Sequence, residues 1–183
     1  MILIHASKMT TSFLLITCLA SPTAIEWADC VTRKYASYAE AQIKFQKKLT
    51  ELIITVAPEY SEVANLYLKD QLDVIERQMI AVKHLSRKRP DQLRVSRPLR
   101  SWLDLTQEDE AGIALANSRY KELLQLSSEA KKRPPHPDGD ALRSLVREKV
   151  SPSPEYRELF SEFVRAVQAL EDEECEDGGA PRS

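Results

Sequence analysis

Few side chains in this 183-residue sequence combine a reactive type with a spacing that supports catalysis. After the first 24 residues there are two histidines: His84 lies among Lys83, Arg87 and Lys88, whose charges disfavour its protonated form, and His136 lies in a proline-rich loop. Neither histidine belongs to a GxSxG nucleophile motif or to an HExxH zinc motif. The cysteines show no CxxC spacing, which argues against redox chemistry. We therefore expect no catalytic, cofactor-binding or metal-ligating residues, which favours a non-enzymatic role.

Glycine is scarce, with four residues in the whole chain: Gly112, Gly139, Gly178 and Gly179. Neither a GxxxxGK[ST] loop nor a GxGxxG loop can be built from them, so the usual phosphate-binding loops are excluded. A β-rich fold needs a turn glycine about every ten residues, so this scarcity also favours helices. The net charge of −2 gives no general attraction to nucleic acid.

The most basic part of the chain is the stretch 83–100, in which Asp91 is the only acid. Pro90 and Pro98 predict that most of this stretch is an extended connection. Such a surface could bind an acidic protein or an anionic lipid surface, whereas the export signal described below argues against nucleic acid. The alternative is that these charges are solvated or are neutralised by the acidic segment 171–177. The candidate residues for an anionic partner are Lys83, Arg87, Lys88, Arg89, Arg94, Arg97 and Arg100.

A second candidate for a binding residue is Gln42. It is the polar member of an otherwise apolar stripe of residues at helical spacing, which includes Tyr35 and Tyr38. One interpretation is that Gln42 is a packing device that sets the register of neighbouring helices or tilts to the edge of their seam. The other interpretation is that Gln42 and the two tyrosines line a polar pocket between helices. That second interpretation corresponds to a small helical enzyme or a ligand-binding bundle.

The stripe belongs to a long amphipathic helix that we predict from Ile25 to about Ala57. Its members recur at steps of four and three residues: Val31, Tyr35, Tyr38, Gln42, Phe45, Leu49, Leu52 and Val56. Pro58 disfavours helical geometry at the residue before it, and the apolar stripe of the next segment is out of phase with the first. We therefore expect a second, antiparallel helix from about Glu59 to Arg87. A single helix kinked at Pro58 is the alternative.

Three further helices are predicted, over residues 106–131, 140–150 and 154–170. Thr106 caps the first of them in a capping-box-like start that ends at Asp109. Asp140 is expected to cap the second, and Ser153 is expected to cap the third. Trp102 lies between the basic stretch and these helices, and we expect it to hold that connection against the core.

These elements predict an all-α fold, four-helix-bundle-like in up-down-up-down order, with one short extra helix. A single domain would span residues 25–173, followed by an acidic, disordered tail over 174–183. In this topology the start of the first helix and the end of the last helix meet at one end, which places Cys30 near Cys175. Once a signal segment is removed, the even cysteine count independently favours one disulfide between them.

Residues 1–24 resemble a secretory signal peptide, with a weakly basic start, a short apolar run and small residues after it. Cleavage is expected after Ala20 or Ala24. The apolar run is too short to cross a bilayer, and no transmembrane helix is expected in the mature chain. The sequence around Cys18 is similar to a lipoprotein box, so anchoring through an acylated Cys18 is a further option. The alternative is a buried N-terminal helix in a cytosolic protein.

Together these features predict an exported protein, periplasmic or secreted, that acts as a non-catalytic interaction or binding module of the bacterial envelope. The alternative is a small helical enzyme or a ligand-binding bundle with a pocket between helices near Gln42. No cofactor is expected in either case. The identity of the ligand or partner does not follow from composition or spacing.

Overall fold

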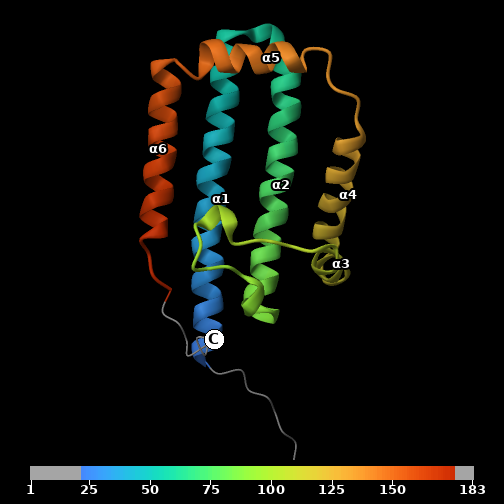
Figure 1. Ribbon diagram of the computed structural model, residues 1–183, viewed down its shortest axis with the longest axis vertical. Coiled ribbons are helices and arrows are strands. Elements are labelled where there is room, and N and C mark those ends of the chain that lie inside the picture. The colour runs from blue at the N-terminus through green and yellow to red at the C-terminus, as the bar shows by residue number, and fades with distance from the viewer. Residues whose placement is uncertain (1–21, 176–183) are drawn as a thin grey trace, which may run out of the picture.

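The structure is a computed structural model that describes residues 22–175 (Figure 1). All regular elements in this range are helical, which confirms the predicted all-α class. The predicted cleavage site after Ala20, the lipidation site Cys18 and most of the predicted tail lie outside the described residues. The helices are α1 Pro22–Val56, α2 Ser61–Lys88, α3 Gln107–Ala116, α4 Ser118–Lys132, α5 Gly139–Leu145 and α6 Pro154–Glu171, with a π-helical turn at Val146–Val150 that continues α5.

α1 and α2 form an antiparallel hairpin, so the predicted break at Pro58 is confirmed and the alternative of one kinked helix is wrong. Ala57, which precedes the proline, has φ −149° and ψ 82°, outside the helical region. The 3₁₀ turn Pro58–Tyr60 reverses the chain, and the Tyr60 amide donates to the Ala57 carbonyl at 3.1 Å. The change of stripe phase after Pro58 therefore reflects two helices that bury different faces.

The long helices lie side by side in the order α6, α1, α2, α4, as Figure 1 shows. α1 contacts α2 and α6, and α2 contacts α4. Neighbours in this row run in opposite directions, while α4 and α6 occupy opposite edges. α5 and its π-helical turn cross the end of the α1–α2 hairpin and contact both helices. The molecule is therefore a flat row of helices with a crossing helix at one end.

The predicted helix over 106–131 is wrong in one respect, because the structure divides it into α3 and α4. Asn117 lies between them with an extended backbone, φ −143° and ψ 110°. Its side-chain oxygen accepts a hydrogen bond from the Tyr120 amide at 2.8 Å, so Asn117 is the N-cap of α4. Asparagine competes for backbone hydrogen bonds in this way, which is why it is weak inside helices and strong at their starts.

The connection between α2 and α3 is held against the core by Trp102, as predicted. Trp102 is buried, and its ring centroid lies 5.7 Å from that of Tyr35 in α1. Its indole N–H donates to the Arg97 carbonyl at 2.9 Å, and its own carbonyl accepts from the Arg94 amide at 3.0 Å. These contacts fold the basic connection, residues 89–105, across one face of the hairpin.

The structure joins Cys30, in α1, to Cys175, which follows the end of α6. Their sulfur atoms lie at bonding distance and their Cα atoms are 5.8 Å apart, as the predicted topology requires. Nearby, the Lys34 ammonium donates to two backbone carbonyls at the end of α6. The Leu99 amide donates to a Glu171 carboxylate oxygen at 3.1 Å. The end of α6 is thus fixed both to α1 and to the connection.

α3 begins with the predicted capping box. The Thr106 hydroxyl accepts from the Asp109 amide at 3.2 Å, and the Asp109 carboxylate accepts from the Thr106 amide at 3.0 Å. Arg89 forms an ion pair with the same carboxylate, which is buried. The hydrogen bonds from Thr106, followed by the Arg89 contact, lower the pKa of Asp109 from its ordinary value of 3.8 to about 2.

We expect the ionised form of Asp109 to stabilise the fold, because its pKa is lower in the folded state than in the unfolded chain. This contribution is fully present above about pH 4 and is lost as the pH falls through the folded-state value of about 2. Melting temperatures of the wild type and of Asp109→Asn, measured from neutral pH into acid, test this. The difference in melting temperature between the two proteins should become smaller as the pH falls from about 4 to about 2. A difference that does not change with pH would show that ionised Asp109 does not stabilise the fold.

Candidate binding site

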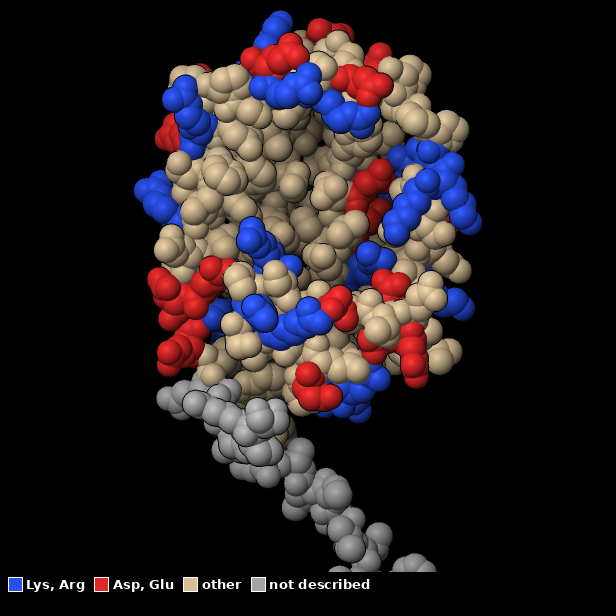
Figure 2. Space-filling view, viewed as in Figure 1, with Lys and Arg blue, Asp and Glu red and all other residues tan. Residues whose placement is uncertain are grey.

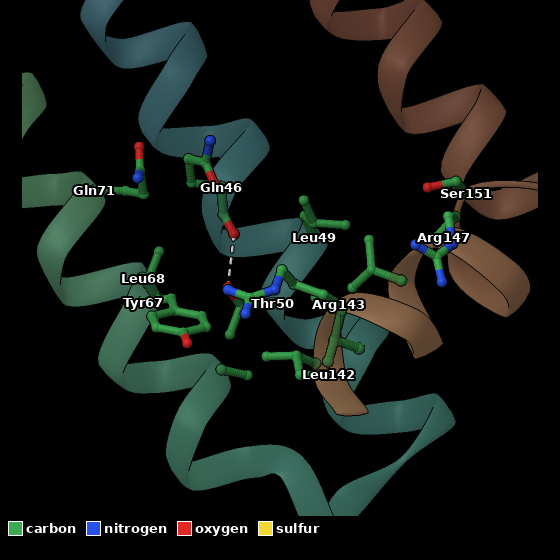
Figure 3. A pocket seen from close by; sticks show the side chains of 13 residues that line it. Gln46, Leu49, Thr50, Tyr67, Leu68, Gln71, Leu142, Arg143, Arg147 and Ser151 are labelled. Atoms are coloured by element: carbon green, nitrogen blue, oxygen red, sulfur yellow. Dashed lines mark hydrogen bonds between the residues drawn. The ribbon is translucent and has the colours of Figure 1, made fainter. Parts of the chain in front are cut away.

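A pocket of about 390 Å³ lies where α5 crosses the α1–α2 hairpin (Figure 3). Its walls come from α1, from α2 and from the segment formed by α5 and the π-helical turn. On the face seen in Figure 2, the upper central surface is hollowed and largely uncharged, and charged side chains lie around it. The wall surface of the pocket is itself mostly apolar.

The two hairpin helices supply their wall residues at the same spacing. Each presents four side chains at positions i, i+3, i+4 and i+7, the pattern of one helix face. Those residues are Gln46, Leu49, Thr50 and Ile53 in α1, and Ala64, Tyr67, Leu68 and Gln71 in α2. Because the hairpin is antiparallel, the last wall residue of α1, Ile53, and the first wall residue of α2, Ala64, both lie near the turn. Both belong to the buried core.

The crossing segment closes the pocket with apolar side chains inside and charged side chains at the edge. Leu142 is buried against Ile53 and Val63 in the core, and Val146 packs on the same cluster. Arg143 and Arg147 also line the pocket, and both are exposed. The chain therefore offers an apolar interior with two guanidinium groups at its rim.

Gly139 of α5 lies beside the end of the Tyr67 side chain of α2. A Cβ atom at position 139 would be 2.7 Å from the Tyr67 hydroxyl oxygen, so a larger residue would displace the end of the Tyr67 side chain. Tyr67 is itself part of the pocket wall. The absence of a side chain at Gly139 thus leaves room for the Tyr67 hydroxyl beside α5.

The polar groups of the wall are mostly those of neutral side chains. The Thr50 hydroxyl donates to the Gln46 carbonyl at 2.9 Å, the hydrogen bond drawn in Figure 3. Its methyl group is then free to face apolar neighbours. Among the described residues that line the pocket there is no aspartate, glutamate, histidine, cysteine or lysine. The wall is therefore suited to binding and poorly equipped for proton transfer or nucleophilic attack.

The predicted site around Gln42 does not coincide with this pocket. Gln42 lies one turn before Gln46 in α1, and neither it nor Tyr35 and Tyr38 contribute to the lining. The Gln42 amide nitrogen donates to the Tyr38 hydroxyl at 2.9 Å, while its amide oxygen is buried without a partner in the described part of the chain. Burial raises the pKa of Tyr35 and of Tyr38 above the usual range. The pocket thus lies further along α1 than Gln42, whose hydrogen bond to Tyr38 stays within that helix.

The predicted basic surface is partly neutralised within the fold. Arg87 pairs with Asp29 at 3.0 Å, Arg89 pairs with Asp109, and Arg94 pairs with Asp104. Lys83, Lys88, Arg97 and Arg100 make no ion pair within residues 22–175. These three acidic partners lie outside the acidic segment 171–177. Blue and red side chains accordingly alternate over the connection in Figure 2.

The two histidines described by the structure lie apart from the pocket. Burial, with the nearby charges of Lys88 and Arg89, lowers the pKa of His84. The His136 ring nitrogen accepts from the Asp138 amide at 3.1 Å in the loop before α5. Over the described residues, no group of three or more His, Cys, Asp or Glu side chains could hold a metal ion. Within the same range, every helix is too short or too polar to cross a membrane.

The sequence matches no known protein-family model, and neither a similar curated protein nor a similar solved structure is found. The arrangement of side chains in the pocket is therefore the basis for a functional assignment.

Proposed function

We propose that this chain is a non-catalytic binding protein that holds a small, largely apolar ligand in the pocket between α1, α2 and α5. The observation that carries the proposal is the pocket itself, which is preformed, open to solvent and has a mostly apolar wall surface. Its volume of about 390 Å³ falls within the range of about 300–1,000 Å³ that is usual for small-molecule sites. Sites between packed helices are a common location for such ligands.

Binding at the pocket is better supported than recognition of an anionic macromolecule by the basic connection. Three of the seven basic residues singled out in the stretch 83–100 already have acidic partners in the fold. None of the seven residues lines the pocket, so in the described part of the chain they have no concave site beside them to hold the rest of a ligand. Recognition of an acidic protein or an anionic lipid surface by that connection therefore stays a prediction.

We further propose that the protein is exported to the bacterial envelope. The support is the signal-like pattern of residues 1–24 together with the pairing of Cys30 and Cys175, because structural disulfides persist in oxidising compartments. Within this proposal the fold is a flattened version of a four-helix bundle in up-down-up-down order, in which α5 is the extra helix. The intact mass of the protein isolated from its native cells would test cleavage after Ala20 or Ala24 and acylation of Cys18.

A neutral, environment-sensitive dye such as Nile red tests the pocket directly. We expect its fluorescence to rise on addition of the folded protein, and we expect Gln71→Trp to abolish most of that rise. Gln71 is an exposed wall residue, so an indole there should obstruct the pocket without disturbing the core. Gln125→Trp is the matched control, because Gln125 is exposed on α4 and does not line the pocket.

Circular dichroism should show the same helix content for both tryptophan variants and the wild type. Equal dye binding by the wild type and Gln71→Trp would place the binding elsewhere and overturn the proposal. The absence of any fluorescence increase with the wild type would overturn it as well.

A further inference from the structure

We propose that the ligand is a single-chain amphiphile whose anionic head group lies between Arg143 and Arg147 while its alkyl chain fills the pocket. This inference rests on the proposed function and adds to it the charge and shape of the ligand. The head group can be a carboxylate or a phosphate, because both present the oxygen pairs that a guanidinium group binds in bidentate fashion.

The interior of the pocket suits an alkyl chain. Leu49, Leu68 and Val146 provide aliphatic wall surface, and the buried side chains Ile53 and Leu142 provide its floor. Ile53 and Leu142 belong to the same core cluster as Val63 and Val150, so the floor is held by the core and does not depend on the ligand. Each methylene group moved from water into such a site contributes favourably to binding.

Both charged side chains among the lining residues are basic. Arg143 and Arg147 are four residues apart on the crossing segment, and the described lining contains no carboxylate. Asp140, predicted as a helix cap, lies instead in the first turn of α5 and pairs with Arg143, which corrects that prediction. Arg147 pairs with its neighbour Glu148 at 3.1 Å. Within the described residues, the acids that pair with the two arginines come from their own segment.

The ion pairs with Asp140 and Glu148 compete only weakly with an anionic ligand for the two arginines. The side chains of Arg143 and Arg147 are 67% and 72% exposed, and their acidic partners are exposed too. Pairs in contact with water contribute little, because solvent screens them and two flexible side chains must be ordered. A head group anchored by its alkyl chain is already positioned at the rim, so it can accept charge-assisted hydrogen bonds from both guanidinium groups.

The backbone under the rim is unusual as well. The segment Val146–Val150 is a π-helical turn, in which the Ser151 amide donates to the Val146 carbonyl at 2.8 Å. Such turns are rare and occur frequently at functional sites. Here the turn carries Arg147 and joins it to Val150, which is fully buried in the core. The wider turn thus anchors the segment while leaving Arg147 at the pocket edge.

The test compares probes that share one alkyl chain and differ in their head groups: dodecanoate, dodecyl phosphate, dodecanol and dodecyltrimethylammonium. Each is titrated below its micelle concentration against the Nile red complex of the full mature protein. We expect dodecanoate or dodecyl phosphate to displace the dye at a concentration about tenfold lower than dodecanol, with the cationic probe weakest. The stronger of the two anions identifies which head group the site favours.

The variant Arg143→Gln/Arg147→Gln should bind dodecanol as the wild type does and lose the preference for anions. Lys121→Gln/Arg165→Gln is the matched control, because it removes the same charge from exposed helical positions outside the pocket. It should retain the preference.

Equal displacement by dodecanol and both anions, or an anion preference that survives in the double arginine variant, would overturn this inference while leaving the proposed function intact. Failure of Nile red to bind would overturn both.

Discussion

Replacing Trp102 with alanine is expected to lower the free energy of unfolding by about 3–5 kcal/mol, the usual cost of removing a large aromatic side chain from a packed core. Trp102 is 3% exposed and contacts Tyr35 of α1 through its ring. Its loss would also leave the Arg97 carbonyl without the indole N–H. The effect should therefore extend to the whole connection that the indole holds in place.

Urea titration followed by circular dichroism measures the loss of stability, and limited trypsin digestion reports on the connection. Arg94 and Arg100 are exposed cleavage points in it, and cleavage there should be faster in Trp102→Ala than in the wild type. Trp102→Phe is the control: it keeps a packed ring but lacks the N–H donor, so a smaller cost of about 1–2 kcal/mol is expected. Wild-type stability of Trp102→Ala would show that the indole does not hold the connection.

Breaking the Cys30–Cys175 bond is expected to cost about 4–5 kcal/mol of stability. The bond links residues 145 positions apart, and in the chain-entropy model a closed loop of this length strongly restricts the unfolded chain. α6 should be affected first, because the linkage lies just beyond its last turn and α6 packs on the row through α1. Hydrogen exchange in α6 should accordingly rise more than exchange in the α1–α2 hairpin.

The measurement is urea unfolding of Cys30→Ala/Cys175→Ala against the oxidised wild type. Wild-type protein in reductant and the single variant Cys30→Ala should both match the double variant, because each lacks the same covalent link. Identical unfolding curves for the wild type under oxidising and reducing conditions would contradict the predicted contribution.

Local sequence signals predicted much of the fold. The out-of-phase stripes on the two sides of Pro58 predicted the hairpin, because a straight helix cannot bury two faces in succession against one core. The cap at Ser153 and the capping box at Thr106 are confirmed, since a hydroxyl at these positions satisfies amides that the helix itself leaves free. The proximity of Cys30 and Cys175 followed from the alternating direction of the long helices.

What the sequence did not reveal depends on contacts between distant segments. Asn117 splits a helix whose apolar residues continue on both sides, so periodicity alone hides the break. The pocket is formed only when α5 crosses the hairpin, and Gln46 and Gln71 are indistinguishable in sequence from ordinary polar surface positions. Arg143 and Arg147 belong to a short segment whose position over α1 and α2 depends on the packing of Leu142 and Val150 in the core.

The link between Cys30 and Cys175 also makes the folded chain a covalent ring over nearly all of its helices. A single proteolytic cut inside that ring, for example in the exposed proline loop before α5, opens the ring but releases no fragment. The two pieces stay joined through the sulfur atoms, and every helix keeps its neighbour. We propose that the protein resides outside the cytoplasm, where it meets proteases and is not replaced by synthesis on the spot. Because of the disulfide, a single break in the backbone does not separate the walls of the pocket.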